Sequence, residues 1–377
     1  MSKTKIPDKV KALLWYKAAG RCEFNGCNKR LDRHGITMDE CNLSNCAHII
    51  ADSPVGPRGS KQSNLLAKDP TNIMLMCPEC HKYIDHEGKD KFDALTLFEM
   101  KRKHEERMEY LTGFKEDLQA VIVTYGANIA DNMPMFNFSE IQRALLPDFY
   151  PSSRNIIELG VNLFSGDNWE YYWKQEERQL MYSCNSKILN YIDQWKYKRI
   201  ALFGFAPMPL LVRLGTILNN KYDVVVYQKQ RSGGWSWPDT AGKTDYIVKK
   251  PETTCNSPIL VLSLSSSIAE RVHNERPDGS IWEITIDTPK TDFLRSKQML
   301  YDFGRKVELV LDEITKVCKG QAIDLYLAVP VACAIEFGRV WMKKANAPLN
   351  IYDFDQRFGN KDKLALTIRV SSSMFQY

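Results

Sequence analysis

Residues 199–227 have the sequence RIALFGFAPMPLLVRLGTILNNKYDVVVY, an apolar strand followed by a helix that Pro207 opens and by a second apolar strand. Residues 322–352, AIDLYLAVPVACAIEFGRVWMKKANAPLNIY, repeat this order. In each copy a glycine, Gly215 or Gly338, lies eight positions after the proline that opens the helix. Two unrelated β–α–β units can look alike by chance, but the shared spacing favours a duplication. Alternating strands and helices indicate a parallel α/β sheet, so we expect two fused Rossmann-like halves.

The composition is that of a globular protein with more than one domain. A length of 377 residues predicts two or three domains. With 44% hydrophobic and 26% charged residues, the chain is not mostly disordered, collagen-like or coiled-coil. The net charge of +5 is too small for a histone-like binder, so nucleic-acid binding needs a local site. Because we find neither a secretion signal nor an apolar run of about 18 residues, we expect a soluble, cytoplasmic protein without a membrane partner.

Metal-binding residue types are concentrated in the first 113 residues, which hold five of the six histidines and six of the ten cysteines. Two pairs have the spacing of zinc knuckles and predict one structural Zn²⁺ site with four sulfur ligands: Cys22, Cys27, Cys77 and Cys80. Cys41 and Cys46 form a rival pair that could replace the first of these. A purely structural zinc module is an alternative for the whole segment, and a redox or disulfide framework is a weaker one. We expect four further side chains to be solvated at the surface: His34, Arg58, Lys61 and His104. Contact with phosphates is the alternative for Arg58 and Lys61.

Three further residues, His48, Asn72 and His81, lie within or directly after the segment that the cysteine pairs bracket. Their order resembles that of the HNH endonucleases, whose ββα-metal fold places these three side chains around one divalent metal. The resemblance covers about residues 15–110 and is carried by the motifs GRC-x4-C, AHI, TNIMLMCPECH and KRKHEE. It implies an α+β, zinc-containing HNH domain that hydrolyses phosphodiester bonds in DNA.

The resemblance also implies a role for each of these residues. His48 is the expected general base, because an imidazole titrates near neutral pH. Asn72 is expected to hold the loop of that histidine or to join the metal shell. His81 and Asp85, one helical turn apart, are expected to bind a catalytic Mg²⁺, Mn²⁺ or Ni²⁺ ion. One position departs from the family, because Ala47 stands where many HNH sites have Asp or His directly before the base.

We expect three segments: an HNH domain over residues 1–113, a helical connector and linker over 114–154, and a sensor domain over 155–377. Within the connector, helices are expected over 115–131 and from Ser139 to Pro147. An HNH domain followed by two Rossmann-like halves resembles the HNH-SAVED effectors of bacterial CBASS anti-phage signalling, whose α/β SAVED domain is a fusion of two CARF-like halves. The segments QKQRSGGWSWP and LVLSLSSS also match that family.

This second resemblance implies how the protein works. A partner nucleotidyltransferase makes a cyclic oligonucleotide, here a cyclic dinucleotide with a cyclic trinucleotide as the alternative. Its binding to the SAVED domain activates cleavage of double-stranded DNA with low sequence specificity, as a homo-oligomer that is expected to be a ligand-induced tetramer. Two other functions are left open by the residues: a modification-dependent restriction endonuclease, and a non-catalytic zinc-binding DNA regulator, which Ala47 favours.

The ligand of an open α/β sheet is expected beyond the carboxyl ends of the strands. Lys229 and Arg231 offer positive donors for phosphates, beside Trp235 and Trp237, whose faces can stack on bases. Core tryptophans and a solvated turn are the alternatives for these four residues. The remaining expected ligand-binding residues lie where strands end: Pro207, Ser265, Ser266 and Pro330. The serines can instead cap the helix that begins near Ile268.

Overall fold

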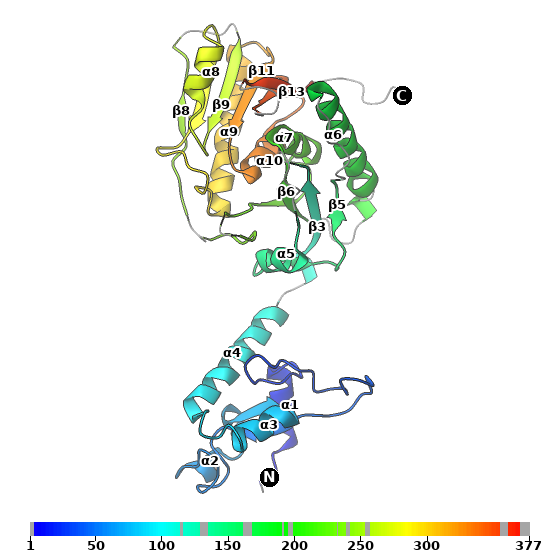
Figure 1. Cartoon of the computed structure of the whole chain (residues 1–377), viewed down its shortest axis with the longest axis vertical. Coiled ribbons are helices and arrows are strands. Elements are labelled where there is room, and N and C mark those ends of the chain that lie inside the picture. Colours follow the sequence, from blue (N-terminus) through cyan, green and yellow to red (C-terminus); the bar gives the residue numbers. More distant parts are fainter. Residues whose placement is uncertain are drawn as a thin grey trace. The chain divides into compact units, whose positions relative to one another are not determined.

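The computed structural model describes residues 4–113, 116–128, 135–160, 168–190, 192–194, 199–231, 233–238, 242–252, 257–354 and 361–369. The chain divides into two compact units, Met1–Lys115 and Glu116–Tyr377 (Figure 1). Among the described helices, each is too short or too polar to cross a membrane.

The first unit is a β-hairpin with helices around it. Its elements are, in order, α1 (Asp8–Lys17), β1 (Asn45–His48), α2 (Ser63–Leu66), η1 (Pro70–Asn72), β2 (Ile73–Met76), α3 (Pro78–Asp85) and α4 (Ala94–Thr112). Strand β1 pairs antiparallel with β2, with His48 opposite Ile73, and α3 follows β2 directly. All four side chains of β2 are buried, because this apolar run lies in the core of the unit. The described part of this unit thus contains a ββα arrangement.

The second unit contains two β-sheets. The strands of the first sheet are β3 (Gln119–Gly126), β4 (Tyr150–Pro151), β5 (Ile157–Glu158), β6 (Ile200–Phe205) and β7 (Val224–Tyr227), in the order β4-β3-β6-β7 with β5 also on β3. The strands of the second are β8 (Ile247–Lys249), β9 (Pro258–Ser263), β10 (Ser280–Thr285), β11 (Ile323–Ala328), β12 (Leu349–Asp353) and β13 (Lys363–Ile368), in the order β13-β12-β11-β9-β10-β8. The first sheet is parallel throughout, and the second is parallel except for its edge strands β8 and β13.

Helices connect the strands and cover the sheets. They are η2 (Glu116–Leu118), α5 (Phe138–Leu145), α6 (Trp169–Cys184), the π-helix η3 (Asn185–Leu189), η4 (Ile192–Gln194), α7 (Met208–Leu218), α8 (Ala269–Glu275), α9 (Lys297–Val317) and α10 (Val331–Val340). Helices α7 and α10 lie against each other (Figure 1) and belong to one continuous core that includes strands of both sheets.

The predicted repeat of a strand, a helix and a parallel strand is confirmed. The first copy is β6-α7-β7 and the second is β11-α10-β12, and the two strands of each copy pair in parallel. The copies share an aromatic pair on neighbouring strands. Phe203 stacks on Tyr227 with ring centroids 4.6 Å apart, and Tyr326 stacks on Tyr352 at 4.7 Å. Matching packing at matching positions supports a duplication.

The two repeated glycines meet where α7 and α10 cross. A Cβ atom added to Gly215 would lie 2.1 Å from the backbone oxygen of Ile335, and one added to Gly338 would lie 2.1 Å from that of Val212. Both distances are far below van der Waals contact, so only glycine permits the helices to pack this closely. The recurring glycine therefore serves the contact between the halves.

The prediction of a helix over residues 115–131 is wrong, because the described part of this segment contains strand β3. This strand runs beside β6 from Val121, opposite Ile200, to Gly126, opposite Phe205. The apolar run QAVIVTYG is rich in β-branched residues and gains a buried position inside a sheet. Tyr150 of the expected linker also pairs with β3. The described residues of the expected connector, 116–128 and 135–154, therefore belong to the second unit.

Candidate functional site

Four cysteine sulfurs converge in the first unit. The Sγ atoms of Cys22, Cys27, Cys77 and Cys80 all lie within 4.8 Å of one another. Those of Cys27 and Cys77 are 4.0 Å apart. A tetrahedral Zn²⁺ with Zn–S bonds of about 2.3 Å separates its sulfur ligands by about 3.8 Å. The group therefore has the dimensions that a zinc ion needs, and it unites the two pairs that the spacing indicated. The rival cysteines, Cys41 and Cys46, lie outside this group.

Local structure explains how the cysteines are presented. Cys77 caps α3, because its Sγ atom accepts a hydrogen bond from the backbone N–H of Cys80 at 3.5 Å. Gly26, with a φ of +82°, makes the tight turn between the first two cysteines. Burial raises the pKa of Cys22 to about 12 and also raises that of Cys80. At these two cysteines the protonated thiol is thus favoured without a cation, and a bound metal would displace the proton.

His48 ends β1 with its side chain buried. Its Nε2 atom lies 2.9 Å from the backbone oxygen of Ala67. A carbonyl oxygen only accepts hydrogen bonds, so Nε2 carries the hydrogen, and in the neutral ring Nδ1 then has the lone pair. The ring is therefore held in the tautomer in which Nδ1 can take a proton.

Asn72, the last residue of η1 directly before β2, is buried and holds the chain that follows His48. Its Oδ1 atom accepts from the N–H of Ile50 at 2.8 Å, and its Nδ2 atom donates to the oxygens of Ile50 and Leu66 at 2.9 and 3.2 Å. Both ends of the amide bind the backbone. This geometry supports the loop-holding role over direct metal binding.

His81 and Asp85 face each other on the partly exposed side of α3. The Nε2 atom of His81 lies 3.2 Å from Oδ2 of Asp85, and Oδ1 of Asp85 accepts from Nη2 of Arg58 at 2.7 Å. Burial alone would raise the pKa of Asp85, but the hydrogen bonds from His81 and Arg58 outweigh it and hold that pKa below its usual value. The carboxylate is thus charged and fixed through one oxygen, beside a histidine nitrogen.

Arg58 was expected to be a solvated loop charge, and that prediction is wrong. Its side chain is only 7% exposed. Nε donates to the oxygen of Ile49 at 2.6 Å, and Nη1 donates to the oxygen of Ile84 at 2.9 Å. Nη2 also lies 3.4 Å from the backbone oxygen of His48. One guanidinium therefore ties the end of β1 to the end of α3.

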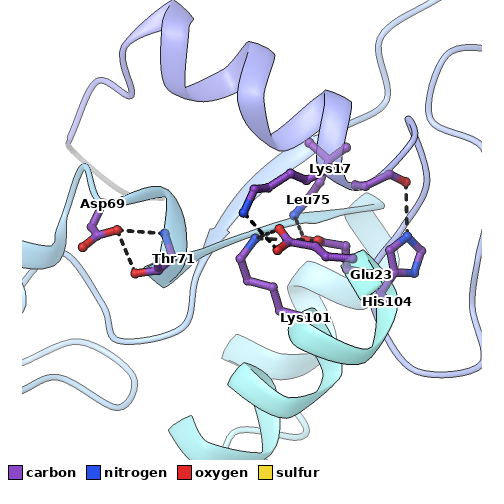
Figure 2. Close-up of polar contacts among 9 residues, drawn as sticks. Lys17, Glu23, Asp69, Thr71, Leu75, Lys101 and His104 are labelled. Carbon is purple, nitrogen blue, oxygen red and sulfur yellow. Dashed lines mark hydrogen bonds and ion pairs between the residues drawn. The ribbon is translucent and has the colours of Figure 1, made fainter. Parts of the chain in front are cut away.

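A buried ionic network, which the sequence did not indicate, supports the first cysteine pair (Figure 2). Glu23 directly follows Cys22, is 1% exposed, and accepts from the backbone N–H of Leu75 through Oε2. Lys101 lies 3.7 Å from its Oε1 atom and 2.5 Å from Glu105. Burial raises the pKa of Glu23 to about 7. The network anchors α4 to the hairpin that carries the site.

His104, on the same helix, was expected at the surface but is 6% exposed. Its Nε2 atom lies 3.1 Å from the backbone oxygen of Ala18, and Arg107 Nη2 donates to its Nδ1 atom at 3.2 Å (Figure 2 shows the first contact). Burial lowers the pKa of His104. The ring is therefore a neutral link between α1 and α4.

In the second unit, several of the expected strand ends lie together. Residues Leu264 and Ser265, after β9, donate their N–H groups to the oxygen of Ala328 at the end of β11, at 3.0 and 2.7 Å. Gln228, after β7, accepts from the N–H of Ala332 in the first turn of α10 at 3.0 Å. The turn after β7 in one half thus reaches the carboxyl edge of the other half.

The expected ligand-binding side chains divide into accessible and buried ones. Arg231 and Ser266 are exposed, and Pro207, Lys229, Trp237 and Ser265 are partly exposed. Lys229 pairs with Glu140 at 3.3 Å and lies 5.3 Å above the ring of Trp235. Ile268 N–H donates to Ser263 at 3.4 Å, so a serine other than the two expected ones lies at that helix start.

Trp235 and Pro330 are buried, so the structure does not offer their side chains to a ligand. Trp235 is 1% exposed, stacks on Phe136 at 5.8 Å and meets Phe203 edge-on at 5.2 Å. These contacts place the indole in the core between the first sheet and α5. The expectation that Trp235 stacks on a base is therefore wrong for this structure.

Comparison with known proteins bears on the second unit. Residues 186–363 match the family model of SAVED, the SMODS-associated and fused to various effectors sensor domain. The chain is also similar to the Cap4 SAVED/CARF-domain containing receptor of Acinetobacter baumannii with the cyclic trinucleotide 2′3′3′-cAAA, at 12% identity and a TM-score of 0.45, over 82% of this chain and 66% of that one. The Cap4 receptor of Moraxella osloensis matches at 9% identity and a TM-score of 0.43, over 82% and 66% of the two chains.

The chain thus spans about two thirds, 66%, of the length of these receptors. No curated protein matches it. The family match covers the crossing helices, the turn after β7 and strands of both sheets. Residues 186–363 of this chain therefore form a SAVED domain.

Proposed function

We propose that this protein is a metal-dependent DNA endonuclease that a cyclic oligonucleotide switches on through the SAVED domain. The observation that best supports a nuclease is the hairpin and helix of the first unit, which carry His48, Asn72, His81 and Asp85 beside four clustered cysteines. The proposed setting is bacterial CBASS anti-phage defence in the cytoplasm, with a partner nucleotidyltransferase that makes the activator.

In the proposed reaction, Nδ1 of His48 takes a proton from the attacking water. Ala67 holds the opposite ring nitrogen in its protonated form, so the imidazole presents its lone pair to the water without a change of tautomer. His81 Nε2 and Asp85 Oδ2 lie 3.2 Å apart and are the atoms proposed to bind a Mg²⁺, Mn²⁺ or Ni²⁺ ion. Such an ion, when bound, stabilises negative charge on the phosphate and on the leaving oxygen.

The rest of the site holds these groups in place. Arg58 binds the other oxygen of Asp85, which leaves Oδ2 directed at His81. Asn72 fixes the chain after His48 through two hydrogen bonds with the backbone of Ile50, and it donates a third to the oxygen of Leu66. The four cysteines are proposed to bind a structural Zn²⁺ that joins the start of α3 to the turn after α1. The buried Ala47 adds no ligand, so the proposed ion has two ligands from these side chains.

The activator is proposed to bind at the carboxyl edge of the two sheets. Lys229 and Arg231 are the proposed phosphate donors, and Trp237, Ser265 and Ser266 are accessible beside strand ends. We propose a cyclic dinucleotide, with a cyclic trinucleotide as the alternative. Activation is proposed to proceed through a ligand-induced homo-tetramer, because two active sites in opposed orientation are needed to cut both strands of DNA.

The test is a cleavage assay with the full-length protein. Plasmid DNA is incubated with Mg²⁺, Mn²⁺ or Ni²⁺, with and without a panel of cyclic di- and trinucleotides. We expect degradation only when a metal ion and one activator are both present. His48→Ala should lower the rate by about 10² to 10⁴ while zinc content and activator affinity stay unchanged. Cleavage by His48→Ala at the parental rate refutes the assignment of the base, and DNA binding without cleavage under all conditions indicates a non-catalytic regulator.

A further inference from the structure

A cavity of about 680 Å³ lies in the second unit, at the edge opposite the proposed activator site. Its walls come from the ends of α7 and α10, from α6 with the following π-helix η3, and from the last residues of β13. Helix α7 begins at the carboxyl end of β6 and returns, so its last residues lie at the amino edge of the sheet. The end of β13 is also there, because Ile368 pairs with Leu349 at the start of β12.

The charged lining of this cavity is entirely cationic among the described residues: Arg213, Lys343, Lys344 and Arg369. Arg213 is already paired with Glu177 at 2.8 Å. The other three are exposed, and none of them forms an ion pair within the part of the chain that the structure describes. Three uncompensated positive charges around one cavity produce a field that attracts an anion.

Two helix ends partly oppose this field. Helices α7 and α10 direct their carbonyl ends toward the cavity, and each contributes roughly half a negative charge. Arg339 reduces the first of these, because its Nη1 atom donates to the backbone oxygen of Asn219 at 3.0 Å. The three full charges of the lining still exceed the two partial ones. The net charge around the cavity is therefore positive, which favours an anionic ligand over a neutral one.

The remaining lining is largely apolar and suits a flat ring system. It includes two thioethers, Met181 and Met342, and the largely buried Trp341. Thioether sulfurs make favourable contacts with aromatic rings. Trp341 is fixed in place, because its indole N–H donates to the oxygen of Ala347 at 2.9 Å. The volume falls in the range of about 300 to 1,000 Å³ that is usual for small-molecule sites.

We propose that this cavity is a second ligand site, separate from the carboxyl edge, that binds an aromatic anion of about nucleotide size. The ring system lies against Met181 and Met342, and the anionic group lies among Lys343, Lys344 and Arg369. The proposal does not depend on the nuclease or on the cyclic oligonucleotide. The ligand would contact the ends of the two helices that cross at Gly215 and Gly338, so it would be held by both halves of the duplication.

The test uses the aromatic sulfonate 8-anilino-1-naphthalenesulfonate, whose fluorescence rises in an apolar site. Titration of the full-length protein should give one saturable site per chain. The triple variant Lys343→Gln, Lys344→Gln, Arg369→Gln should bind about tenfold more weakly, because each exposed cation contributes roughly a factor of two to three. The matched control changes three exposed cations outside the lining to glutamine: Arg154, Lys174 and Arg178. It should bind like the parent protein.

Three outcomes would overturn the proposal. The first is binding that does not saturate, and the second is equal affinity in the parent and the Lys343, Lys344, Arg369 variant. The third is saturable binding that occurs only after residues 370–377 are deleted, which would make the carboxyl-terminal segment the occupant of the cavity. The two triple variants change only exposed side chains, and circular dichroism of these two variants and of the deletion protein serves to exclude unfolding as the cause.

Discussion

Gly338→Ala tests the packing between the two halves of the second unit. In an open helix this change stabilises by about 1 kcal/mol, because alanine has the higher helix propensity. At this position the new Cβ atom would lie 2.1 Å from the backbone oxygen of Val212 and 2.9 Å from Cα of Gly215. Backbone atoms cannot rotate away as a side chain does, so the helices must separate. Overpacking costs about 1 to 3 kcal/mol or more, and we expect a net loss of about 2 kcal/mol.

The assay is urea unfolding followed by tryptophan fluorescence, which reports on the second unit because seven of the eight tryptophans lie after residue 116. Gly215→Ala should show a similar loss, since its Cβ atom would meet Ile335 at 2.1 Å. Gly304→Ala in α9 is the matched control, because the nearest atoms belong to the flexible side chain of Glu336 at 3.2 Å. A Gly338→Ala protein as stable as the parent would refute the close helix contact.

Three other changes test separate parts of the molecule. Cys77→Ser should lower zinc content and unfold the first unit, and a variant with full zinc and parental stability by metal analysis and circular dichroism would contradict this. Arg58→Met should destabilise the first unit by about 2 to 3 kcal/mol, because it leaves the buried carbonyl oxygens of Ile49 and Ile84 without a donor. An unchanged midpoint of urea unfolding would contradict this role of Arg58. Burial raises the pKa of Glu176 to about 7, above its value in the unfolded chain. The native state therefore binds the extra proton, and stability falls as pH rises from about 4.5 to 7. Glu176→Gln should remove this pH dependence of stability, and it should be more stable than the parent at pH 8 but not at pH 4. Parallel pH profiles of the two proteins would show that burial does not raise the pKa of Glu176.

The repeated halves could be predicted from the sequence because their signals are local. A proline that opens a helix and an apolar run before it lie within a few residues of each other. The cluster of four cysteines could be predicted for the same reason, since each pair lies in one short turn. Strand β3 was missed because a short apolar run fits a buried helix or a buried strand equally well. Its partner, β6, is about 80 residues away along the chain, and only that pairing decides between the two.

For Trp235, the neighbouring residues in the sequence do not predict whether the indole is buried or faces a ligand. The neighbouring Lys229 and Arg231 suggested a polar, ligand-facing turn, and Lys229 does lie near the ring. The two groups that bury the indole, Phe136 and Phe203, come from distant parts of the chain. An indole beside cations is equally suited to a nucleobase and to a core with a cation at its rim. The sequence contains no signal that separates these two environments.

Arg58 illustrates how a loop in an insert becomes part of a proposed active site. The 49 residues between Cys27 and Cys77 exceed what a compact zinc module needs, and a charged residue there is expected to be solvated. The carbonyl oxygens in the last turn of a helix have no partner within that helix, and the oxygen of Ile84 is one of them. The guanidinium satisfies it together with the oxygen of Ile49 and the carboxylate of Asp85. Since the same side chain meets the ends of β1 and α3, the insert sets the separation between the proposed base and the proposed metal ligands.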